Sequence, residues 1–232
     1  YRAATGIEPL WTSAMFSGMP AYQISVLFPS NLIQYVSNVF MLGLPSPANL
    51  LFLGLLGFYI LMITLKADYR IGIAGAIAYA FCSFNFVSIT AGHNTKVQAI
   101  MLIPMILAGV IMAYRSKWLL GAAITGLALS VQIYANHLQI SYYLAITIGM
   151  LILFEAARAI QEKQLPHFFK ASIALGVAAG LAVLPNITNL LLTYEYGNYS
   201  ARSQSELTDK KVSTGLDKDY ALGWSYGKLE TM

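Results

Sequence analysis

The chain has 232 residues, of which 57% are hydrophobic and only 10% charged, and its mean hydropathy is +0.62. Soluble globular domains carry about 25% charged residues, so this composition excludes an ordinary soluble domain. The net charge of +4 does not indicate nucleic-acid binding, because basic residues in membrane proteins largely record which loops face the cytoplasm. We therefore expect an all-α, polytopic membrane protein with membrane lipids, and no nucleic acid, among its partners.

The N-terminal part of the chain predicts a loop followed by one amphipathic helix. Residues 1–23 contain Pro and Gly too often for a long helix. In Ser30–Leu44, by contrast, Asn31, Gln34 and Asn38 recur at helical spacing and share one face. This pattern predicts a helix that lies in the membrane interface. A spanning helix with its polar face inside the bundle is the alternative.

Six apolar runs follow, each close to the ~20 residues that cross a bilayer as a helix. They are Pro47–Leu65, Ile71–Thr90, Val97–Tyr114, Trp118–Tyr134, Ile140–Ala157 and Ala171–Leu192. The predicted organisation is an outer loop with an interfacial helix (1–46), a transmembrane bundle (47–192) and a truncated outer loop (193–232). The single cysteine, Cys82, lies within the second run and is expected to be a small buried residue. Because the chain begins at Tyr1 without Met and ends in mid-pattern, we expect an internal fragment of a longer protein.

The basic residues of the short connections predict the orientation of the bundle. One set of connections holds seven of them, namely Lys66, Arg70, Arg115, Lys117, Arg158, Lys163 and Lys170. The alternate connections, residues 93–96 and 136–139, hold only Lys96. Basic residues are enriched in cytoplasmic loops, so the first set is predicted to be cytoplasmic and its charges are explained as topology signals and solvated helix ends.

The unusual polar residues then fall together on the extracytoplasmic side. The candidate binding residues are His93, Asn94, Lys96, Asn136, His137, Gln139, Glu195 and Arg202. Ionisable groups at the mouth of a helical bundle are functional candidates, although a single histidine in a short loop is more often an ordinary turn residue. Two histidine-and-amide clusters on one side, with an acidic and aromatic segment after the sixth run, favour a shared binding site.

These residue types suit a phosphorylated, partly lipidic ligand. Lys96 offers a point charge to a phosphate and Arg202 offers a planar fork. His93 and His137 titrate near neutral pH, and amide side chains both donate to and accept from sugar hydroxyls. Anionic lipid headgroups bound without chemistry fit the same set. We expect no cofactor. A divalent metal held by His93, His137 and Glu195 is an alternative, but no local spacing of histidines and acids supports it.

Five short blocks of this sequence together resemble one family of bacterial membrane proteins. They are Glu8-Pro-Leu-Trp11, Phe16-Ser-Gly-Met-Pro-Ala-Tyr-Gln23, Ala91-Gly-His-Asn-Thr-Lys96, Ala135-Asn-His-Leu-Gln139 and Trp224-Ser-Tyr-Gly-Lys228. In this order they resemble the YfhO-type integral membrane proteins, in wording closest to the Bacteroidetes branch. The resemblance spans essentially the whole chain.

The resemblance implies a glycosyltransferase-like protein of the GT-C type in the bacterial cytoplasmic (inner) membrane. Such a protein would take sugar from a polyprenyl-phosphate donor and pass it to a cell-envelope acceptor on the outer face. The resemblance also implies an acidic catalytic base on the first external loop, expected upstream of Tyr1, so no catalytic residue is assigned here. Two other functions stay open from the residues: a lipid or solute transporter, and a non-catalytic subunit of an envelope membrane complex.

Overall fold

The computed structural model describes residues 5–6, 10–13, 18–23 and 31–197, and most of this part is helix. The chain divides into two compact units, Phe28–Ile187 and a second one made of Tyr1–Leu27 with Thr188–Met232. In the second unit, the strands β1 (Trp11–Thr12) and β2 (Met19–Pro20) pair antiparallel. A short 3₁₀ helix, η1 (Ala21–Gln23), follows β2, and α10 (Ile187–Gly197) contributes the helical part of this unit.

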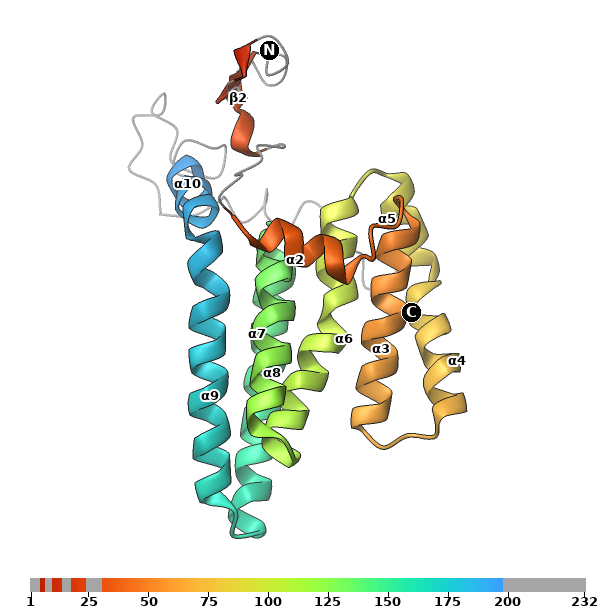
Figure 1. Cartoon of the computed structure of the whole chain (residues 1–232), viewed down its shortest axis with the longest axis vertical. Coiled ribbons are helices and arrows are strands. Elements are labelled where there is room, and N and C mark those ends of the chain that lie inside the picture. Colours follow the sequence, from red (N-terminus) through yellow and green to blue (C-terminus); the bar gives the residue numbers. More distant parts are fainter. Residues whose placement is uncertain (1–4, 7–9, 14–17, 24–30, 198–232) are drawn as a thin grey trace, which may run out of the picture. The chain divides into compact units, whose positions relative to one another are not determined.

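The larger unit is a bundle of helices (Figure 1). Its elements are α2 (Ile33–Phe40), α3 (Ala48–Thr64), α4 (Tyr69–Ala80), α5 (Ser83–Thr90), α6 (Asn94–Arg115), α7 (Trp118–Tyr134), α8 (Leu138–Gln161), α9 (Leu165–Val183) and the 3₁₀ turn η2 (Leu184–Asn186). Four helical segments are long and apolar enough to cross a membrane: Tyr69–Thr90, Asn94–Arg115, Leu138–Gln161 and Leu165–Gly197. The structure thus confirms a mostly helical fold with four helices able to cross a membrane. Helices α3 and α7 are apolar but shorter, so the count of six spans stays a prediction.

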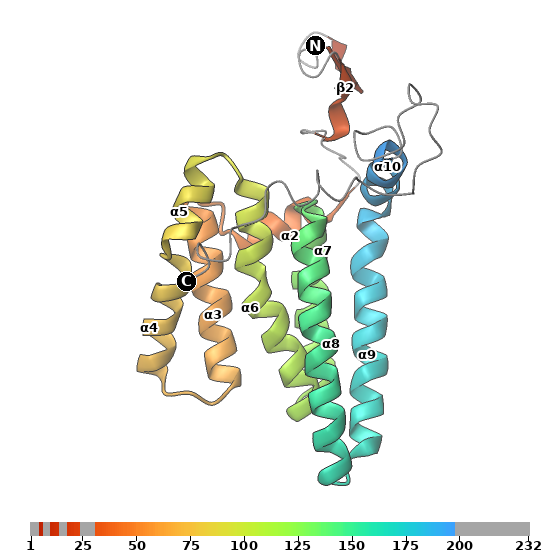
Figure 2. The ribbon, with the colours of Figure 1, turned by 180° about the vertical axis from the view of Figure 1, so that it is seen from behind.

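Helix α6 is the centre of the bundle. It packs against α3 on one side and α7 on the other, and α7 packs in turn against α9. Figure 2 shows α8 running alongside α7 and α9, with α3, α4 and α5 at the opposite edge. Most of α6 is buried, whereas α8 and α9 keep long exposed apolar stripes. Such stripes suit a lipid environment, where apolar side chains need no cover.

Small residues bring α6 and α7 into close contact. A Cβ atom added to Gly109 would lie 2.8 Å from the carbonyl oxygen of Gly121, and one added to Gly121 would meet the backbone of Ala113. Gly109 and Ala113 on α6, and Gly121 and Thr125 on α7, are each four residues apart. Small residues at this spacing let membrane helices approach at backbone distance.

The second predicted run is not one straight helix. It is divided at Phe81 and Cys82 into α4 and α5. The side-chain amide of Asn85 donates to the carbonyls of Tyr79 (2.8 Å) and Ala80 (3.2 Å), which lose their helical partners at the break. The expectation that Cys82 is buried is therefore wrong, because the break turns this residue to the surface.

Helix α2 lies across one end of the bundle (Figure 1). It is shorter than the predicted Ser30–Leu44, and its inward side carries Ile33, Val36 and Phe40 against the core with Ser37 buried among them. At 1.5 Å per residue an eight-residue helix is about 12 Å long. This length is too short to span a bilayer, which removes the spanning alternative.

Candidate functional site

The two turns that carry His93 and His137 have the same backbone design. In each, an alanine ends one helix, the next residue takes a left-handed conformation, and a histidine stands at the N-cap of the following helix. The left-handed residues are Gly92 (φ 80°) and Asn136 (φ 52°), the types that tolerate this conformation best. Neither histidine side chain caps its helix, so both rings are available for other contacts.

Both turns lie at the same end of the bundle, beside α2 (Figure 1). We call this the histidine end and define it by residues 91–98 and 135–139. The connections that follow α3, α6 and α8, with most of the basic loop residues, lie at the opposite end, which we call the basic end. The structure thus brings the two predicted clusters together as the alternation of inward and outward spans requires. Helices α6 and α8, which begin at the histidine end, also contact each other.

The charges of the histidine end influence one another. Lys96 lies over the ring of Phe84, with its Nζ atom 4.8 Å from the ring centroid, a cation–π contact that holds the ammonium near α5. Burial lowers the pKa of His137 below its ordinary value of 6.5, and the nearby positive charges of Lys96 and His93 lower it further. His137 is therefore mostly neutral at pH 7, and its buried Nδ1 atom has no hydrogen-bond partner among the residues that the structure describes.

A layer of buried polar groups lies one turn beneath these residues. Gln98 donates to Ser37 Oγ (3.3 Å) and thereby joins α6 to α2. Asn186 donates to the carbonyl of Ser130 (3.0 Å) and accepts from Asn31 (3.3 Å). We call Ser37, Gln98, Asn31, Asn186 and Gln132 together the polar belt. Side chains that hydrogen-bond across helices link membrane segments at defined positions.

The other predicted site residues are not all part of this group. Asn94 and Gln139 are exposed, and Gln139 donates to the hydroxyl of Tyr143 (3.0 Å). Glu195 lies on α10 in the other compact unit, and Arg202 lies outside the described residues. The cluster that the structure assembles consists of His93, Lys96 and His137, with the neighbouring amides at its rim.

Sequence reasoning missed a charged cluster at the basic end. The side chain of Glu155 is fully buried and accepts from Nε of Arg115 (2.8 Å) and from Nε of Arg158 (2.7 Å). The expectation that these arginines are merely solvated helix ends is thus wrong, because both are ion-paired to a buried carboxylate; their role as topology signals stays a prediction. The available signal was an acid inside an apolar run with an arginine three residues later, since buried charges are paired.

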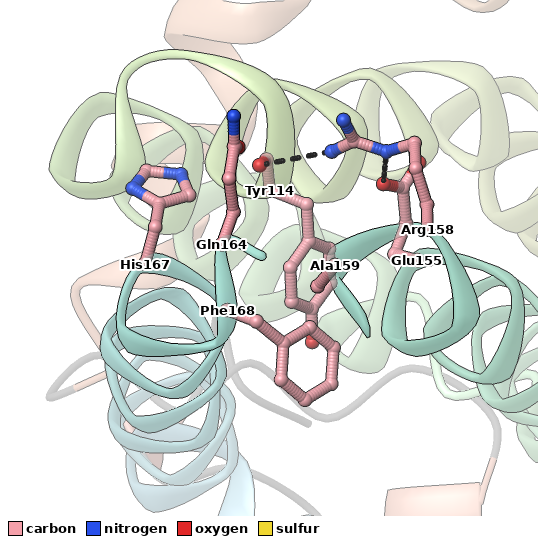
Figure 3. Close-up of a pocket in the computed structure, with 7 residues that line it drawn as sticks. All are labelled: Tyr114, Glu155, Arg158, Ala159, Gln164, His167 and Phe168. Atoms are coloured by element: carbon pink, nitrogen blue, oxygen red, sulfur yellow. Dashed lines mark hydrogen bonds and ion pairs between the residues drawn. The ribbon is translucent and has the colours of Figure 1, made fainter. Parts of the chain in front are cut away.

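This basic-end cluster also caps α6. Arg158 donates through Nη2 to the carbonyl of Tyr114 (3.3 Å), and His167 donates through Nε2 to the carbonyl of Ala113 (3.2 Å). Figure 3 shows Tyr114, Arg158 and His167 around a small pocket whose lining also includes Gln164 and Phe168. The last carbonyls of a helix need such outside donors, and a cation there is favoured by the helix dipole. We therefore assign this cluster to structure.

In the described part of the chain, no three His, Cys, Asp or Glu side chains gather to hold a metal ion. No protein-family model matches the chain, and no curated protein or solved structure is significantly similar to it. The family resemblance noted from the sequence blocks therefore stays a prediction. What the molecule offers to a functional argument is the geometry of the histidine end.

Proposed function

We propose that this chain is part of a GT-C-like membrane glycosyltransferase whose histidine end holds the phosphate of a polyprenyl-phosphate sugar donor. The observation that carries the proposal is that Lys96, His93 and His137 share the end of the bundle where α6 and α8 begin, and that Lys96 and His93 both lower the pKa of His137. The orphan N–H groups and positive dipole of a helix N-terminus favour an anion. Two such termini beside the ammonium of Lys96 suit the binding of a phosphate.

The low pKa of His137 suits a site whose histidine becomes protonated only when an anion binds. Without ligand, burial and the neighbouring Lys96 and His93 keep its pKa low. A phosphate bound beside it would oppose these effects and favour the protonated ring, because an opposite charge raises the pKa of a base. The ring would then donate a hydrogen bond to the phosphate, and such charged hydrogen bonds contribute roughly 1.5–3 kcal/mol.

The proposed reaction divides between this end and a carboxylate base. The acceptor hydroxyl attacks the anomeric carbon, the bond from that carbon to the phosphate oxygen breaks, and the carboxylate base takes the hydroxyl proton. Polyprenyl phosphate leaves with the bonding electrons. The histidine end would stabilise the charge of this leaving group, while Asn94, Asn136 and Gln139 supply amides at the rim for sugar hydroxyls. The proposed location is the outer face of the bacterial cytoplasmic membrane, with an envelope acceptor.

Sugar transfer from a polyprenyl-phosphate donor by membranes containing the full-length protein tests the proposal. His93→Gln and Lys96→Met should each lower turnover about tenfold or more, the factor that a lost charged hydrogen bond implies. Lys163→Met, at the basic end, is the matched control and should leave turnover unchanged. Full activity in both histidine-end variants would remove the site assignment.

A transporter is the other class of function that the composition allows. It needs buried polar groups whose hydrogen-bonding atoms are free to contact the transported substrate. The buried Asn85, Gln132 and Asn186 instead donate to backbone carbonyls of neighbouring or own helices. Such bonds are structural, so they favour the transferase proposal. Flux of a lipid-phosphate sugar across reconstituted vesicles without product formation would reverse this preference.

A further inference from the structure

Gln132 is the one belt residue that connects the two helices carrying the histidine-end charges. Its side chain is fully buried near the end of α7. Its Nε2 atom donates to the carbonyl of Ala99 on α6 (3.0 Å), and its Oε1 atom accepts from the hydroxyl of Ser141 on α8 (3.4 Å). One amide thus joins α6 to α8 at a level one turn below Lys96 and His137.

We propose that Gln132 is a positioning residue that sets the distance between Lys96 on α6 and His137 on α8. This inference rests on the proposed function for its purpose, but its geometry does not depend on any donor. A buried amide in an apolar bundle costs free energy unless its donor and acceptor are satisfied. The observed placement of α6 and α8 satisfies both atoms of Gln132, so the amide favours that placement.

Packing fixes this distance only in part. Helix α8 is largely exposed along its length, and near the histidine end its buried contribution to the core is Leu144, in the cluster that includes Val97 and Met101 of α6. The close approach of small residues that locks α6 to α7 involves Gly109 and Gly121, which lie farther along these helices. At the histidine end, the link through Gln132 and Ser141 therefore adds a directional constraint to the packing of Leu144.

The test measures how strongly Lys96 influences His137 in the full chain, in detergent micelles without any donor. The chain has three histidines, so the ring signal of His137 can be identified by NMR from its loss in His137→Gln. In the wild type, Lys96→Met should raise the pKa of His137, because a nearby cation is removed. In a Gln132→Met background the same substitution should raise it by less than half as much. Such a double-mutant cycle isolates the coupling from the separate effects.

Matched variants separate positioning from general loss of structure. Ser37→Ala removes a belt bond between α6 and α2 and should leave the coupling unchanged. Ser141→Ala cuts the link from the α8 side and should weaken the coupling, while Ser141→Thr, which keeps the hydroxyl, should restore it. These two variants also decide the question if Gln132→Met does not fold.

Undiminished coupling in Gln132→Met, or in Ser141→Ala, would overturn the inference. Equal loss in Ser37→Ala would overturn it as well, since the effect would then be general. Loss of coupling with unchanged sugar transfer in the Lys96 and His93 variants would leave the positioning role standing and remove the proposed function instead. The two failures are thus distinguishable.

Discussion

At the scale of single residues, Tyr79 supplies a hydrogen-bond donor that Pro104 removes from α6. Proline has no N–H group, so the carbonyl four residues earlier, that of Ile100, loses its helical donor. The hydroxyl of Tyr79 on α4 donates to this carbonyl at 2.7 Å. A carbonyl in an apolar bundle has no water to turn to, so a side chain from a neighbouring helix takes the place of the missing amide.

We expect Tyr79→Phe to destabilise the protein by about 1 kcal/mol, the usual net value of one hydrogen bond, or somewhat more because the acceptor is left unpaired. The phenyl ring keeps the stacking on Phe58. In a Pro104→Ala background, the new amide serves Ile100 and Tyr79→Phe should cost little. Thermal unfolding in detergent measures both effects, and equal costs in the two backgrounds would contradict this explanation.

For Glu155, too, the hydrogen-bond partners determine how much a substitution destabilises the protein. Removing one member of a buried ion pair leaves an uncompensated charge and costs about 3–5 kcal/mol. We expect Glu155→Gln to approach the lower figure, because the side chain of Arg115 is 38% exposed and water screens it. Glu162→Gln is the control: its side chain is 43% exposed, and surface ion pairs contribute only about 0–1 kcal/mol. Similar unfolding temperatures for the two variants would show that the Glu155 cluster is not buried in this way.

At the scale of helices, the contact between α6 and α7 depends on the absence of side chains. We expect Gly121→Leu to separate these helices and to lower the unfolding temperature strongly, because the added atoms would occupy the position of the Ala113 backbone. Gly176→Leu on α9 is the matched control, since a Cβ atom there meets nothing within 4 Å. A larger effect at position 176 than at position 121 would contradict the packing described here.

The helices themselves could be predicted from the sequence, but their interruptions could not. Apolar runs of membrane-spanning length give α3, α6, α7 and α8 within a few residues of their predicted bounds, because composition alone decides which segments avoid water. The break at Cys82 escaped prediction. It exists because Asn85 can reach back to two carbonyls, a local competition that hydropathy does not register.

The candidate site could likewise be predicted only in part from the sequence. Alternating spans require that the turns with His93 and His137 share one end, so this part followed from the sequence. The link through Gln132 did not, because it depends on the rotation of three helices about their own axes. The pairing of Glu155 with Arg115 was missed for the same reason, since these residues are 40 positions apart and meet only after α6 and α8 have packed.

At the scale of the whole bundle, the two ends have different chemistry. At the basic end, Glu155 neutralises two arginines, and Arg158 also caps α6. The histidine end, residues 91–98 and 135–139, holds His93, Lys96 and His137 and no carboxylate. The ammonium of Lys96 beside two helix N-termini favours the binding of an anion there.

The most direct test of this account is the affinity of the purified full-length protein for a short-chain polyprenyl phosphate. We predict that Lys96→Met binds it about tenfold more weakly than the wild type, as expected for one lost charged contact. Lys163→Met, which removes the same charge at the basic end, should bind as the wild type does. Equal affinity of all three proteins would contradict the assignment of the histidine end to lipid phosphate.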